Sequence, residues 1–145
     1  MDEIERAETL VRAKRFDEAL TLLDELSKKP STSRRALGIR AWLLRSMGRL
    51  EEALQDIDRT LELRPGNAGD LHNRAVIWTA LEEYDRAIED YEAVLQIDPG
   101  CAGTLNNLAW VLATSKEKAF FQPERALALA VKAAASSQES HILDT

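Results

Sequence analysis

The sequence predicts an all-α solenoid built from helical hairpins, and three observations lead to this fold class. Between Ala68 and Cys101, two segments with apolar residues at helical spacing are joined by a short acidic turn. The chain also matches itself after shifts of 34 residues, which align the alanines Ala7, Ala41, Ala75 and Ala109. Each middle unit closes with a proline and a glycine, at Pro65-Gly66 and Pro99-Gly100. A period of this length with two helices per unit is typical of helical solenoids.

The third copy resembles the tetratricopeptide repeat family, whose pattern runs W-x2-L-G-x2-Y, then A-x3-F, then P. The residues that stand at these positions are Leu71, Arg74, Ala75, Trp78, Ala87, Tyr91 and Pro99. In the second copy they are Leu37, Arg40, Ala41, Leu44, Ala53, Ile57 and Pro65. The resemblance covers roughly residues 1–136. It implies a right-handed α-α superhelix of four hairpins that binds a segment of another protein in a concave groove.

The period divides the chain into four repeats, at 1–33, 34–67, 68–101 and 102–136, followed by a C-terminal tail at 137–145. In the fourth repeat Phe121 stands where the period requires an alanine, and the match resumes at Ala126. We therefore expect an insertion of about five residues near 116–122. Phe120-Phe121 would plug the widened hairpin there or contact a partner.

Each helix follows from local signals. In the first repeat, apolar faces lie at Ile4 to Val11 and at Phe16 to Leu26, with Asp17 as the expected cap of the second helix. The first helix of the second repeat is expected to be capped by Thr32 or Ser33 and to end at Gly48, where a left-handed backbone costs glycine least. Leu50 to Leu61 form its second helix, which the run Arg64-Pro65-Gly66-Asn67 ends.

In the third repeat Asp70 is the expected cap, and Glu82-Glu83 replace the glycine turn, which suggests a different backbone path. In the fourth, Leu105, Leu108 and Leu112 continue the apolar face, and Pro123 suits the first turn of the last helix.

Residues that recur at the same position of each repeat, which we call a column, lead to two packing predictions. The recurring alanines fit a close helix crossing that has room for little more than a methyl group. Arg40 and Arg74 stand in one column and Asp56 and Asp90 in another, so we expect the pairs Arg40–Asp56 and Arg74–Asp90 across each hairpin. The alternative is that these are solvated charges on separate faces.

Bulk properties narrow the class of protein. The net charge of −6 over 145 residues argues against a general nucleic-acid binder, which needs a basic face. The single cysteine, Cys101, cannot form an internal disulfide and favours a reducing compartment. The acidic, amphipathic start is unlike a signal peptide, and no apolar run is long enough to cross a bilayer. The sequence therefore predicts a cytoplasmic protein with no membrane or nucleic-acid partner.

Catalytic motifs are lacking. The sequence contains no metal-ligand spacing, phosphate-binding glycine loop or nucleophile elbow, so we expect neither an enzyme nor a cofactor. The pairs Glu51-Glu52 and Glu82-Glu83 are expected to be solvated turn residues, and Cys101 a packed small residue.

The expected site is a surface on the first helices, which by the resemblance line the groove. Trp42 and Trp110 stand at equivalent positions, and Val76 stands at the equivalent position of the repeat between them. The two tryptophans either form the apolar bottom of a peptide site or pack against neighbouring helices. Trp78 is expected to be structural. The predicted peptide-binding residues are Arg35, Ile39, Trp42, Arg45, His72, Asn73, Val76, Thr79, Asn106, Asn107 and Trp110. On the first helix of the chain the same phase selects Glu5, Glu8 and Arg12.

Two functions stay open at this point. The first is a scaffold that binds a segment of an unidentified protein in the groove. The second is self-association into homo-oligomers through the alanine-rich last helix. Some members of the resembled family hold a partner's terminal carboxylate with groove lysines, arginines and asparagines. Asn73 fits that set, but Ile4 and Glu8, or Gly38 and Trp42, stand at the other key positions.

Overall fold

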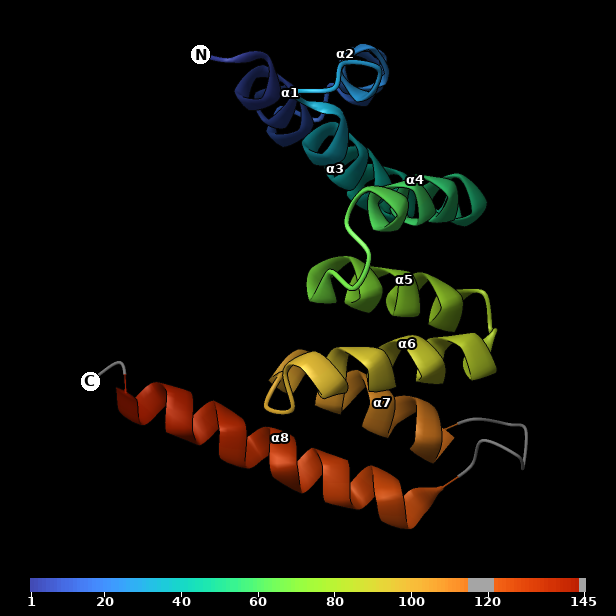
Figure 1. Cartoon of the computed structure of the whole chain (residues 1–145), viewed down its shortest axis with the longest axis vertical. Coiled ribbons are helices and arrows are strands. Elements are labelled where there is room, and N and C mark those ends of the chain that lie inside the picture. Colours follow the sequence, from blue (N-terminus) through green and yellow to red (C-terminus); the bar gives the residue numbers. More distant parts are fainter. Residues whose placement is uncertain (115–121, 144–145) are drawn as a thin grey trace. The chain divides into compact units, whose positions relative to one another are not determined.

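The computed structural model describes residues 1–114 and 122–143, with side chains as far as Ser136 (Figure 1). This described part contains eight α-helices and no strand, which confirms the all-α fold class. The helices are α1 Glu3–Arg12, α2 Phe16–Ser27, α3 Ser33–Ser46, α4 Leu50–Leu63, α5 Ala68–Ala80, α6 Tyr84–Ile97, α7 Ala102–Thr114 and α8 Pro123–Leu143. Helix α8 continues into the segment expected to be a tail, because no proline or glycine interrupts it. The expected insertion and Phe120-Phe121 lie outside the described residues, apart from Gln122.

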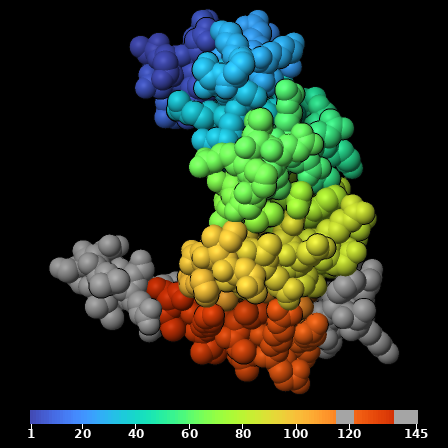
Figure 2. All heavy atoms as spheres, in the orientation of Figure 1, coloured from blue at the N-terminus to red at the C-terminus, as the bar shows by residue number. Residues whose placement is uncertain are grey.

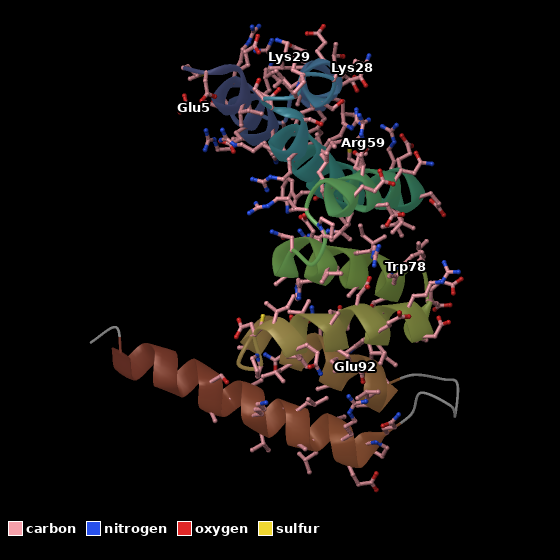
Figure 3. All side chains as sticks on the ribbon, viewed as in Figure 1. Glu5, Lys28, Lys29, Arg59, Trp78 and Glu92 are labelled. Carbon is pink, nitrogen blue, oxygen red and sulfur yellow. The ribbon has the colours of Figure 1, made fainter. Side chains whose placement is uncertain are left out.

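The chain forms two compact units, Met1–Asp70 and Leu71–Thr145. In the first unit α1 packs on α2 and α3, and α3 packs on α2 and α4 (Figure 1). Its core contains the buried residues Ile4, Ala7, Ala19, Leu23, Leu26, Ala36 and Leu43. Lys29, labelled in Figure 3, donates a hydrogen bond from Nζ to Glu3 Oε2 at 2.9 Å and ties the end of α2 to the start of α1.

In the second unit α7 lies between α6 and α8 and packs on both (Figure 1). One core joins all four of its helices through Ala75, Ala87, Tyr91, Leu108, Ala109, Val111, Leu112 and Ala126. The space-filling view shows the side chains of these helices as a closely packed body (Figure 2). Because all four helices share this core, residues on the surface of the unit are held in defined positions.

The alanine columns are buried as the period predicts. Ala7 and Ala75 on the first helices are fully buried, and Ala41 is 2% exposed. On the second helices Ala19, Ala53 and Ala87 are fully buried as well. The small side chain at these positions lets neighbouring helices approach closely.

The hairpin turns correct one prediction. Lys14, Gly48 and Glu82 stand one period apart and all have a left-handed backbone, with φ of 60°, 77° and 60°. The turn at Glu82 therefore follows the same path as the glycine turn, although a left-handed L-residue costs about 1–2 kcal/mol. Each turn is closed by a hydrogen bond from the next amide to a carbonyl five residues earlier, as in Arg49 N to Leu44 O at 2.9 Å.

The helix caps also differ from the prediction. Helix α2 begins at Phe16 with no side-chain cap, so Asp17 lies inside its first turn. Thr32 precedes α3, but its hydroxyl donates to Leu26 O instead of capping. At α5 the Asn67 side chain accepts from Asp70 N at 2.9 Å, which makes Asn67 the cap.

Candidate functional site

A pocket in the first unit is built around Trp42. Glu8, Val11 and Arg12 of α1 form one side, and Gly38, Ile39 and Trp42 of α3 form the other. The hollow is open and has a volume of about 460 Å³. The indole of Trp42 is 52% exposed, so one side of it packs while the rest faces the hollow. We call this hollow the Trp42 pocket.

A second pocket, the Trp110 pocket, lies within the second unit. It is lined by Val76, Thr79 and Ala80 of α5, Tyr91 of α6, and Asn107 and Trp110 of α7, and it has a volume of about 290 Å³. Trp110 is 55% exposed, much like Trp42. Tyr91, by contrast, is buried and lines the pocket from α6.

The two pockets occupy equivalent positions at a spacing of two repeats. A shift of 68 residues places Trp42 on Trp110 and Ile39 on Asn107, and it places Val11 on Thr79. Each pocket arises where two successive first helices lie side by side. The lining residues on the earlier helix are three or four positions apart, so they share one face of that helix. They face lining residues on the later helix that are three positions apart. The geometry of the repeat therefore produces the pocket, and the side chains decide what it can bind.

The predicted residues that line these pockets are Ile39, Trp42, Val76, Thr79, Asn107 and Trp110. Arg35 and Arg45 lie on α3 one turn before and after the Trp42 pocket, and Arg35 is exposed. Asn73 and Asn106 are exposed on α5 and α7 but are not part of the pocket lining.

His72 is directed toward the protein interior. Its Nδ1 lies 2.7 Å from the hydroxyl of the fully buried Thr104, and its ring meets Tyr91 edge-on with centroids 5.8 Å apart. The helical phase placed His72 on the groove face, but a residue at the edge of that face can turn inward when a buried hydroxyl is in reach.

Sequence reasoning missed Tyr91 as a pocket residue. It stands in the family's aromatic position on the second helix, and this position suggested only a core role. In the structure Tyr91 is buried in the core of the second unit and also lines the Trp110 pocket.

The predicted ion pairs are confirmed and anchor the helices that carry the pockets. Arg40 donates from Nε and Nη2 to both oxygens of Asp56 at 2.8 Å. Arg74 binds Asp90 in the same bidentate way at 2.7 and 2.9 Å. Arg40 has a further partner that the sequence did not suggest, because its Nη1 donates to Asp24 of α2 at 3.0 Å. This arginine therefore holds α3 to both α2 and α4.

The charges shift the pKa values of these groups. Hydrogen bonding to Asp56 is the main cause that raises the pKa of Arg40. The pKa of Asp24 is lowered, chiefly by its hydrogen bond with Lys28 and less by Arg40. The raised pKa of Arg40 and the lowered pKa of Asp24 both favour the charged form of each group.

Comparison with known proteins decides the family. Two family profiles described as tetratricopeptide repeat match residues 4–68 and 71–101, together more than half of the chain. The chain belongs to the tetratricopeptide repeat family. No curated protein matches it in sequence.

Solved structures share the fold of this tetratricopeptide repeat protein. A crystal structure of MamA has a TM-score of 0.81 and 18% identity, and the match covers 96% of this chain and 78% of that one. MamA from Desulfovibrio magneticus has a TM-score of 0.80 and 14% identity, over 94% and 75% of the two chains. A tetratricopeptide repeat protein from Parabacteroides merdae has a TM-score of 0.68 and 22% identity, over 94% and 59%. At these identities the likeness shows the fold alone.

Three other observations concern possible chemistry in this tetratricopeptide repeat protein. Cys101 is a free, partly buried thiol whose Sγ lies 3.2 Å from the Thr104 hydroxyl. Within residues 1–114 and 122–143, no three His, Cys, Asp or Glu side chains are grouped so that they could hold a metal ion. None of the described helices has both the length and the apolar composition needed to cross a membrane.

Trp78 differs from the two pocket tryptophans. Trp78, labelled in Figure 3, packs against the core of the second unit. The Arg86 guanidinium lies 4.8 Å from its ring centroid. Such a cation–π contact stabilises a partly exposed indole. Trp78 therefore has a structural position, as predicted.

Proposed function

We propose that this tetratricopeptide repeat protein is an interaction scaffold that binds segments of other proteins through the Trp42 and Trp110 pockets. One observation carries the proposal: the chain places a half-exposed tryptophan beside an open hollow in each of its units. An exposed indole costs free energy in water, and tryptophan is the residue most enriched at interface hot spots. The pocket walls add aliphatic surface in the first unit and amide and hydroxyl groups in the second, which suits a peptide.

The test uses a peptide selected from a random-sequence library for binding to the intact chain. Trp42→Ala and Trp110→Ala should each weaken binding by about tenfold or more, because a truncated hot spot typically costs at least about 2 kcal/mol. Fluorescence anisotropy of the labelled peptide measures the affinity. Far-UV circular dichroism at the assay temperature verifies that each variant is folded, because the covered half of each indole contributes to stability. Trp78→Phe is the matched control and should bind normally. Full affinity in both alanine variants would reject the proposal.

We also infer a second candidate function, self-association through α8. Leu127 and Val131 are 67% and 62% exposed and stand four residues apart on one face of this helix. The exposed Ala130 and Ala134 extend the same face. Contiguous apolar surface of this kind on a soluble protein typically marks a contact with another protein.

Sedimentation equilibrium tests this alternative. We expect a concentration-dependent dimer, and we expect Leu127→Glu to return it to a monomer because the substitution buries a charge in the contact. A monomer at every concentration would exclude the alternative and leave the pocket proposal untouched.

A further inference from the structure

Helix α3 has an unusual charge composition. It contains Arg34, Arg35, Arg40 and Arg45 and no acidic residue. Arg40 is engaged by Asp24 and Asp56. The other three have no ion-pair partner among the residues that the structure describes. Arginines without an internal partner are available to a ligand.

Three arginines stand in or next to the Trp42 pocket. Arg12 lines it directly from α1. Arg35 stands four residues before Ile39, and Arg45 three residues after Trp42, so both lie on the pocket face of α3 at adjacent helical turns. Arg12 donates a long hydrogen bond from Nη2 to the Thr9 hydroxyl at 3.4 Å.

Acidic groups near the pocket are fewer. Glu8 lines it beside Arg12. Glu5, labelled in Figure 3, accepts from the Asp2 amide and closes the capping box at the start of α1. The lining thus contains one acidic side chain, Glu8, and one arginine, Arg12. One helical turn beyond the lining stand Arg35 and Arg45 on α3 and Glu5 on α1, so basic side chains are in excess by one.

The Trp110 pocket shows that the fold does not need these arginines. At the positions equivalent to Arg12, Arg35 and Arg45, the second unit has Ala80, Gly103 and Ala113. The second unit therefore has the equivalent tryptophan but no positive charge at these three positions. The remaining charge is also uneven, because residues 1–70 contain 13 basic and 14 acidic side chains while residues 71–145 contain 6 and 11. Most of the net negative charge, which would repel an acidic ligand, therefore belongs to the second unit.

We propose that the Trp42 pocket binds an apolar side chain carried by an acidic segment of a partner protein. The apolar side chain lies against Trp42, Val11 and Ile39, and flanking carboxylates bind Arg35, Arg45 and Arg12. Guanidinium groups bind carboxylates bidentately, and the pair is stronger beside an apolar wall that excludes water. This inference rests on the proposed function and names the chemistry of one of its two ligands.

A nucleic acid is the weaker fit to the same charges. Strong binding to a phosphate backbone typically requires about six to ten contacts from basic side chains, and three arginines around one pocket provide fewer. A single hollow with aliphatic walls is suited to one side chain.

The test compares synthetic peptides on the intact chain by isothermal titration calorimetry. The first has a central phenylalanine with two glutamates on each side. The others replace all glutamates by glutamine, or the phenylalanine by serine. We expect the glutamate peptide to bind about tenfold or more tightly than either analogue, and its affinity to fall as salt is raised.

Variants locate the site. The double variant Arg35→Gln, Arg45→Gln should weaken the glutamate peptide by about tenfold or more and leave the glutamine peptide unchanged. Glu8→Gln should strengthen the glutamate peptide, because it removes a like charge from the pocket. Arg59→Gln is a control for the loss of a positive charge elsewhere on the same unit: Arg59 is exposed on α4 (Figure 3), and its loss should have little effect.

The outcomes separate this inference from the proposed function. If glutamate and glutamine peptides bind equally and Trp42→Ala weakens both, the acidic preference is wrong and the pocket function stands. If neither peptide binds, or if a single-stranded oligonucleotide binds more tightly than the glutamate peptide, the inference is also overturned. If no library peptide depends on Trp42 or Trp110, the proposed function fails with it.

Discussion

Replacing Arg40 with leucine is expected to lower the free energy of unfolding by about 3 kcal/mol or more, the typical cost of stranding a buried charge. The Asp56 side chain is only 8% exposed and has both oxygens bound by Arg40. Without the guanidinium this carboxylate stays buried with neither water nor a cation to replace the lost hydrogen bonds. Urea unfolding followed by circular dichroism measures the change.

The fourth repeat supplies the matched control. At the positions equivalent to Arg40 and Asp56 it has Leu108 and Leu129, which pack into the core of the second unit. The double variant Arg40→Leu, Asp56→Leu should therefore recover most of the lost stability, since a buried ion pair is replaceable by apolar residues that pack well. A single Arg40→Leu variant as stable as the natural protein would show that the pair contributes nothing.

Replacing Ala75 with leucine is expected to destabilise the protein by about 1–3 kcal/mol, because it overpacks a helix crossing. Ala75 is fully buried and belongs to a cluster with Ala87, Leu108 and Leu112, which are fully buried too. These neighbours leave no space for three more carbon atoms unless α5 moves away from α6 and α7. Differential scanning calorimetry should show a melting temperature lower by several degrees.

Ala80→Leu is the control for this prediction, because Ala80 lies on the same helix but is exposed. Its effect on stability should fall within about 0.5 kcal/mol, as for most surface substitutions. Equal melting temperatures for the Ala75 and Ala80 variants would contradict the assigned helix crossing.

Several features of the site could be predicted because they depend only on the position of a residue within the repeat. Helical phase places Trp42 and Trp110 on an exposed face, and the structure shows a pocket beside each. The same phase brings Arg40 to Asp56 and Arg74 to Asp90, because residues in matching columns of one hairpin face each other. What binds in the pockets stays a prediction.

Other features depend on atoms distant in the sequence. His72 was placed on the groove face, but a buried hydroxyl at Thr104 draws it inward. Tyr91 of α6 lines the Trp110 pocket together with residues of α5 and α7, which are distant from it in the sequence. Lys14 and Glu82 adopt a left-handed backbone without glycine, since the hairpin closure requires that path whichever residue is present.

The sequence by itself determined the family, the all-α class and the buried alanine columns, because a repeated spacing states which face of each helix is covered. Only the tertiary structure decided which side chains meet across that face. Arg40 bridging Asp24 and Asp56 and the two tryptophan pockets are of this kind. The physical reason is that periodicity specifies direction around a helix axis, whereas contact requires the distance to a second helix, and packing alone sets that distance.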